Sequence, residues 1–89
     1  MNLPREKPRV LIVGCGFPQL GLLRAARSLG LFVVGVDANP EAIGATACDR
    51  FEIASTHDAD AVVRAARAAR VDGITTANLA ILRAVQEKP

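Results

Sequence analysis

The stretch from residue 9 to residue 37 constrains the fold of this chain more than any other. An apolar run over residues 10–13 meets a glycine-rich turn, and a helical pattern over residues 18–29 then stops at Gly30. A second apolar run follows and ends on Asp37. Continuous apolar runs are typical of strands that are buried on both faces of a parallel sheet. The stretch therefore predicts a strand–helix–strand unit whose glycines lie where the first strand turns into the helix.

The rest of the chain continues the alternation of strands and helices. We expect a short helix over residues 40–47, a strand over 51–54, a helix over 59–70, a strand within 71–76 and a last helix over 78–87. Right-handed crossovers order four such strands 3-2-1-4. The predicted fold class is α/β, a four-stranded parallel open sheet with helices on both faces, half of a doubly wound Rossmann-like fold.

Helical spacing and capping patterns predict which side chains face inward and where helices begin. A capping box over residues 55–58 precedes the helix that we expect over residues 59–70, and Gly30 suits the residue after a helix end. The expected inward-facing residues of the three longer helices are Leu22, Leu23, Ala26, Leu29, Val62, Val63, Ala66, Ala69, Leu79, Leu82 and Val85.

Length and composition limit the class of protein. The 89 residues make one small domain, which we place at residues 9–89 after a flexible lead-in over residues 1–8. A hydrophobic share of 51% indicates a globular chain. A net charge of +2 and an aromatic share of 3% argue against a nucleic-acid partner, because a protein that binds nucleic acid needs clustered cations or aromatic surfaces on which bases stack.

Targeting signals are weak in this sequence. No apolar run approaches the roughly 20 residues that span a bilayer, so we expect no membrane partner. The first residues lack the apolar segment of a signal peptide, which favours a cytoplasmic protein. Cys15 and Cys48 have no metal-ligand spacing, and we expect two free thiols and no metal site. A helix start lowers the pKa of a nearby thiol, but we interpret Cys15 as a small residue in a tight turn.

The glycine turn, which we place at residues 14–17, is the main candidate for binding a ligand, because backbone N–H groups at a helix start favour anions. Its spacing is G-x-G-x-x-x-x-G, whereas the dinucleotide fingerprint G-x-G-x-x-G has its third glycine where this chain has Gln19. Asp37 stands where an acidic residue would hold a ribose hydroxyl, or it can cap a turn beside Asn39. Thr76 and Asn78 lie at the carboxyl end of the fourth strand, where they can face a ligand or cap the last helix.

The longer string GCGFPQLGLLRAARSLGLFVVGVDANPEAIGATACDRF resembles the N-terminal, or pre-ATP-grasp, domain of ATP-grasp ligases. This superfamily includes carbamoyl-phosphate synthetase-like and biotin carboxylase-like proteins. The matching positions are Gly16, Gln19 to Gly21, Arg24 to Ala26, Leu29, Gly30, Val36 to Pro40 and Asp49. The resemblance covers residues 9–76 and implies an ATP-dependent ligase of the carbon–nitrogen bond-forming kind.

The resemblance implies that this domain shapes part of the acceptor-substrate site with its glycine turn and the loop after the fourth strand. The candidate substrate-binding residues are Gly14, Gly16, Phe17, Gln19, Leu20, Gly21, Asp37, Thr76 and Asn78. No catalytic residue is assigned. In the family, ATP and Mg²⁺ lie between later domains that nothing in this chain matches, so we expect no cofactor in this chain and no ligase reaction by it alone.

Three interpretations of function remain open from the sequence. The first is an acceptor-side domain, truncated relative to the family, whose partners are ATP-grasp catalytic domains in cis or in trans and a small-molecule acceptor. The second is a stand-alone NAD(P)-binding module. The third is a structural or assembly domain, because an open sheet leaves two edges through which a homodimer can form.

Overall fold

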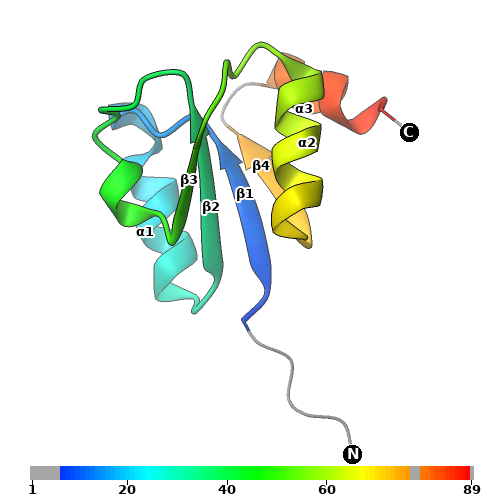
Figure 1. Ribbon diagram of the computed structural model, residues 1–89. Coiled ribbons are helices and arrows are strands. Elements are labelled where there is room, and N and C mark those ends of the chain that lie inside the picture. Colours follow the sequence, from blue (N-terminus) through cyan, green and yellow to red (C-terminus); the bar gives the residue numbers. More distant parts are fainter. Residues whose placement is uncertain (1–6, 77–78, 89) are drawn as a thin grey trace, which may run out of the picture.

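The computed structural model describes residues 7–76 and 79–88, and it forms one open sheet with helices on both faces (Figure 1). Four parallel strands lie in the order β3-β2-β1-β4. Their bounds are β1 Arg9–Val13, β2 Phe32–Asp37, β3 Arg50–Ile53 and β4 Gly73–Thr76. The predicted fold class and strand order are confirmed.

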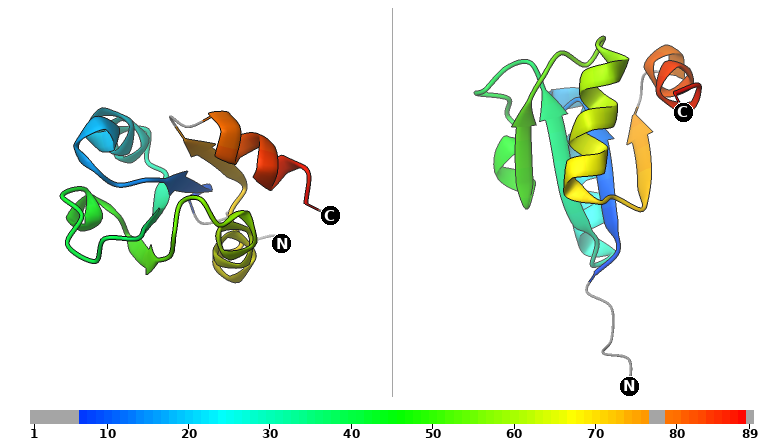
Figure 2. Two further views of the ribbon diagram at one scale, coloured as in Figure 1. Left: turned by 90° about the horizontal axis from the view of Figure 1, so that it is seen from above. Right: turned by 45° about the vertical axis from the view of Figure 1, so that its right-hand side comes forward.

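The helices divide between the two faces of the sheet. Their bounds are α1 Leu20–Ser28, α2 Ala59–Ala69 and α3 Leu79–Gln86, with two short 3₁₀ turns, η1 Phe17–Gln19 and η2 Ala45–Ala47. Seen from above, α1 and η2 lie on one side of the sheet, and α2 and α3 lie on the other (Figure 2). None of the helices in the described part of the chain has both the length and the apolar character needed to cross a membrane.

The core has two layers because alternate residues of the central strands point to opposite faces. Leu11 and Val13 pack with α2, whereas Ile12 packs with α1. The side chains of Leu11, Ile12, Val33 and Val34 are fully buried, which accounts for the continuous apolar runs of β1 and β2.

Helix α1 ends in a Schellman motif, which satisfies two otherwise unpaired carbonyl groups. Gly30 has φ +76°, its N–H donates to Arg27 O over 2.9 Å, and Leu31 N–H donates to Ala26 O over 3.1 Å. The expected C-terminal role of Gly30 is confirmed. The predicted buried stripe of α1 is wrong at two positions: Leu23 and Ala26 are buried, but Leu22 is 36% exposed and Leu29 is 76% exposed. Leu29 follows the helix, so helical spacing does not place its side chain.

Helix α2 begins at Ala59, as predicted, but the first residue of the predicted capping box, Ser55, is not its N-cap. Asp58 is its N-cap, and the Asp58 carboxylate accepts from Ala61 N–H over 3.1 Å. Ser55 instead accepts from the backbone N–H of His57 in the preceding turn. The inward face is as predicted, with Val62, Ala66 and Ala69 buried and Val63 packed against them.

The predicted helix over residues 40–47 is wrong, since that segment contains turns and only the short η2. Gly44 explains the difference: a Cβ there would lie 2.6 Å from Cys15 O, so the segment follows a close approach to the glycine turn rather than a helical path. On α3, Val85 is buried as predicted, whereas the side chains of Leu79 and Leu82 lie outside the described residues.

Candidate functional site

The carboxyl ends of three strands meet at one edge of the sheet. Val13, the last residue of β1, pairs with Val36 of β2 on one side and with Thr76 of β4 on the other. The Thr76 hydroxyl also donates to Val13 O over 3.0 Å. In parallel open sheets, ligands bind in a crevice outside this edge. The fold therefore brings the glycine turn, Asp37 and Thr76 to the place where such a ligand would lie.

The glycine turn begins with a left-handed residue. Gly14 has φ +94°, a conformation that L side chains rarely adopt, and its N–H donates to Val36 O over 2.7 Å. Gln19, from η1, lies back over the turn: its side-chain atoms come within 3.3 Å of a Cβ built on Gly14 or on Gly16. The absence of side chains at both glycines makes room for the Gln19 amide.

Two backbone N–H groups at the start of η1 have no hydrogen-bond acceptor among the described residues. No described residue accepts a hydrogen bond from the N–H of Gly16 or of Phe17, whereas the N–H of Gln19 donates back to Gly16 O over 3.0 Å. Donors of this kind at a helix start attract anionic groups. The turn therefore presents two backbone N–H groups beside the Gln19 side chain.

A hydrogen bond to Asp37, the last residue of β2, connects the glycine turn to this strand. Asp37 Oδ2 accepts from Cys15 N–H over 2.8 Å, and Asp37 Oδ1 accepts from Asn39 N–H over 2.9 Å. Each carboxylate oxygen thus has one backbone partner and keeps further acceptor capacity. The described contacts of Asp37 are those of a turn acceptor beside Asn39.

The segment between β2 and β3 closes against the glycine turn. Gly44 N–H donates to Cys15 O over 2.8 Å, and a Cβ on Gly44 would also meet Leu23 Cδ1 at 2.5 Å. This contact was not predicted from the sequence, where Gly44 falls within the helix expected over residues 40–47. The sequence signal that could have indicated this contact is a glycine within a predicted helix, at a position where no turn requires one.

The other candidate residues have different surroundings. Phe17 is 76% exposed, and nothing lies within 4 Å of a Cβ built on Gly21. Leu20 packs against the core layer of α1. Asn78 lies outside the described residues.

The two thiols are free, as expected, and lie side by side. Cys15 Sγ and Cys48 Sγ are 3.9 Å apart. The pKa of the Cys15 thiol is raised, mainly by its hydrogen bond to Cys48 and by burial. That hydrogen bond lowers the pKa of Cys48. Burial and the neighbouring Cys48 sulfur thus raise the pKa of Cys15, whereas a helix start would by itself lower the pKa of a thiol.

Asp49 ties the start of β3 to β2. Its Oδ2 accepts from Val33 N–H over 2.7 Å, and its Oδ1 lies 3.1 Å from Arg27 Nη1. The hydrogen bond from Val33, and then Arg27, lower the pKa of this carboxyl. Asp49 is part of the family resemblance, and its described contacts hold the sheet together away from the glycine turn.

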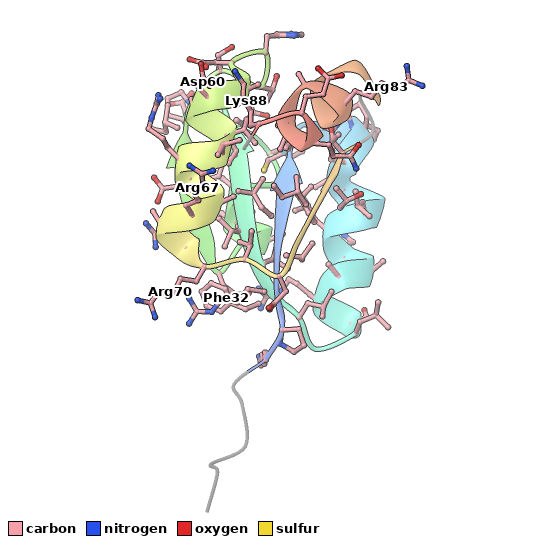
Figure 3. The ribbon with its side chains drawn as sticks, turned by 90° about the vertical axis from the view of Figure 1, so that its right-hand side faces the viewer. Phe32, Asp60, Arg67, Arg70, Arg83 and Lys88 are labelled. Carbon is pink, nitrogen blue, oxygen red and sulfur yellow. The ribbon has the colours of Figure 1, made fainter. Side chains whose placement is uncertain are left out.

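Two cavities of about 420 Å³ each lie away from the glycine turn. One is an open cavity bordered by α2, β4 and α3, with Arg67, Arg70 and Lys88 among its lining residues. Figure 3 shows Arg67 and Arg70 along α2, and Lys88 beside Asp60, to which it forms an ion pair of 2.9 Å. The other lies where β1 and β2 begin, at the end of the sheet opposite the glycine turn, and is lined by Lys7, Arg9, Phe32 and Asp49. No group of three His, Cys, Asp or Glu side chains within the described ranges could hold a metal ion.

Solved structures share this fold. The chain is similar to glycinamide-RNase-transformylase T from Mycobacterium tuberculosis, with 25% identity and a TM-score of 0.74 over 89% of this chain and 24% of that one. For phosphoribosylglycinamide synthetase from Anaerococcus prevotii the identity is 28% and the TM-score 0.73, over 84% and 19%. For N5-carboxyaminoimidazole synthetase from Staphylococcus aureus, solved with ADP, the values are 21% and 0.76, over 99% and 24%.

No protein-family model matches the chain, and no curated protein matches it. The chain spans between 19% and 24% of the length of the three solved structures named above. Those structures are ATP-grasp enzymes, and the matched part is the N-terminal domain of that superfamily. The resemblance seen in the sequence is therefore confirmed: this chain is similar to the N-terminal domain of ATP-grasp enzymes.

Proposed function

We propose that this chain is the acceptor-substrate-side N-terminal domain of an ATP-grasp carboxylate–amine or carboxylate–thiol ligase. It acts with ATP-grasp catalytic domains, in cis or in trans, and is not catalytically competent alone. The observation that carries the proposal is the convergence of the glycine turn, Gln19 and Thr76 at the carboxyl edge of a sheet with this fold.

The chemistry divides between this domain and its partners. In the family, ATP phosphorylates a carboxylate, and an amine or similar nucleophile then attacks the acyl phosphate. In the family, ATP and Mg²⁺ lie between the later domains, so we assign them to the catalytic domains and propose no cofactor for this chain. Its own task is to bind and orient the acceptor.

Binding of the acceptor depends on backbone and amide donors. In this proposal, the N–H groups of Gly16 and Phe17 and the Nε2 amide group of Gln19 donate to an anionic group of the acceptor. Thr76 borders the same edge through its bond to Val13 O. A phosphate ester is a suitable probe, because one similar structure is a phosphoribosylglycinamide synthetase. Ribose 5-phosphate is the stable compound that we would use.

Calorimetric titration tests this proposal. Ribose 5-phosphate is expected to bind the isolated chain with a Kd in the range of about 0.1–1 mM, because one anchored group supplies only part of the full site's affinity. ATP and NAD⁺ are expected to give no heat of binding. Micromolar binding of NAD⁺ would instead favour a dinucleotide-binding module. A lack of binding by ribose 5-phosphate, with a concentration-dependent dimer in sedimentation, would favour an assembly domain.

A pair of matched substitutions separates a specific site from general affinity for phosphate. Gln19→Leu removes the amide over the glycine turn, and its affinity for ribose 5-phosphate is expected to fall about tenfold. Gln86→Leu makes the same change at an exposed position near the end of α3 and is expected to leave the affinity unchanged. Equal loss in both variants, or in neither, would contradict the assignment of the site to the glycine turn.

A further inference from the structure

The two cysteines form a close pair although they lie 33 residues apart in the sequence. Cys15 follows Gly14 at the tip of β1, and Cys48 directly follows η2. Their sulfur atoms are 3.9 Å apart, and neither residue lies inside a helix or a strand. A disulfide bond has an S–S distance of about 2 Å, so the two side chains need to move by only about 2 Å in total.

The sheet leaves room for this pair. Gly35, in the middle of β2, lies against both sulfur atoms, and a Cβ built on it would meet Cys15 Sγ at 2.6 Å and also Cys48 Sγ. A glycine inside a strand often marks a close approach by another group. Here the approaching groups are the two thiols, which fill the place of a side chain at this position.

The two thiols differ in access. Cys15 is fully buried, whereas Cys48 is partly exposed. The charged groups around the pair are Asp37, whose carboxylate accepts from Cys15 N–H, and Arg27 and Asp49, which lie beside Cys48. A thiol reagent from solution therefore reaches Cys48 first, and Cys15 is placed to react only with Cys48.

We propose that Cys15 and Cys48 are a site of reversible covalent modification, at which low-molecular-weight disulfides such as oxidised glutathione convert the pair to an internal disulfide. This inference is independent of the proposed ligase function. The bond would join the glycine turn directly to the segment that already contacts it through Gly44.

The reaction takes two thiol–disulfide exchanges. Cys48 loses its proton to solvent, and its sulfur attacks one sulfur of oxidised glutathione, which forms a mixed disulfide and releases one glutathione thiolate. Cys15 Sγ then attacks Cys48 Sγ, forms the internal bond and releases the second glutathione, which takes the Cys15 proton. The protein pair is oxidised by two electrons, and oxidised glutathione is reduced to two molecules of glutathione.

The test is equilibration of the purified chain in buffers with a graded ratio of oxidised to reduced glutathione. The mass of the protein is expected to fall by two hydrogen atoms, with no added glutathione at equilibrium. Trypsin cleaves after Arg9, Arg24, Arg27 and Arg50, so the expected product links peptide 10–24 to peptide 28–50. Linkage between two chains, or a stable glutathione adduct on the wild-type protein, would overturn the proposal.

Single variants test the order of the two steps. Cys15→Ala is expected to accumulate a stable glutathione adduct on Cys48, and Cys48→Ser is expected to resist modification because Cys15 is buried. Equal reactivity of the two variants would contradict this order. Should either variant fail to fold, the wild-type chain in urea serves as the comparison. The equilibrium constant for oxidation of the two thiols by oxidised glutathione is expected to be about 30-fold greater in the native chain than in urea. An equal constant in urea would show that the fold does not favour the bond.

Discussion

The backbone N–H of Cys15 donates to the carboxylate of Asp37 over 2.8 Å, and this bond joins the glycine turn to the end of the neighbouring strand. The other oxygen of Asp37 accepts from Asn39 N–H over 2.9 Å. One side chain thus holds both loops at the carboxyl edge of the sheet in place.

Asp37→Ala is expected to lower the free energy of unfolding by about 1–3 kcal/mol, because it removes the acceptor of two backbone N–H groups. Asp37→Asn keeps one oxygen and is expected to lose less. Urea unfolding measures both changes. Glu41→Ala removes an exposed carboxylate from the same loop and is expected to change stability by less than about 0.5 kcal/mol. Equal losses in Asp37→Ala and Glu41→Ala would mean that the two bonds contribute little.

Gly35→Ala is expected to destabilise the chain by about 1–3 kcal/mol, because its methyl group would overlap both thiols. Gly21→Ala is the matched control, since nothing lies within 4 Å of the added methyl group. Because alanine favours the helical conformation, this second variant is expected to gain up to about 1 kcal/mol. Urea unfolding of both variants gives the comparison, and a stable Gly35→Ala protein would show that the thiols have more room than described.

Arg70→Gly is expected to stabilise the chain by about 0.5–1 kcal/mol. Arg70 ends α2 with φ 53°, a left-handed conformation that is costly for a residue with a Cβ. Arg70→Ala removes the same charged side chain but keeps the Cβ, so it is expected to bring no such gain. A thermal unfolding midpoint that rises equally in both variants would point to the charge of Arg70 rather than to its backbone.

Asp49 is expected to make stability depend on pH in the acid range. Its pKa is lower in the folded chain than the ordinary value of 3.8, mainly because Val33 N–H donates to it. Its contribution is therefore present above the unfolded pKa and is lost as pH falls through the folded pKa. Asp49→Asn is expected to reduce the slope of unfolding free energy against pH below about pH 4, by up to about one proton.

Salt separates the two causes of this shift. A salt concentration of about 1 M shortens the screening length to about 3 Å and so weakens the charge attraction of Arg27, whereas the hydrogen bond from Val33 remains. The difference in slope between wild type and Asp49→Asn is therefore expected to persist in salt. Its disappearance would assign the effect to Arg27.

The strand–turn–helix–strand unit was predictable from the sequence because local patterns specify it. Apolar runs, the glycine turn and Gly30 each act within a few residues, and the structure has β1, α1 and β2 in the expected places. The strand order also followed, because parallel strands with right-handed crossovers leave few arrangements.

Contacts between distant residues were not predictable in the same way. The helix expected over residues 40–47 was wrong because Gly44 approaches Cys15 O, a contact that local propensity does not record. The predicted capping box was wrong because both Ser55 and Asp58 are suitable N-cap residues. The structure shows that Asp58 is the N-cap of α2, since its carboxylate accepts from Ala61 N–H. The pairing of Cys15 with Cys48 depends on Gly35, whose importance shows only once β2 lies beneath both thiols.

The most direct test of the proposed function is an amide NMR titration of the labelled chain with ribose 5-phosphate. Saturable shifts are expected at the backbone amides of Gly16 and Phe17 and at the side-chain amide of Gln19. No saturable shift is expected at Arg67 or Arg70, beside the cavity between α2 and α3. Saturable shifts confined to that cavity, or none at the glycine turn, would contradict the claim that the turn binds the acceptor.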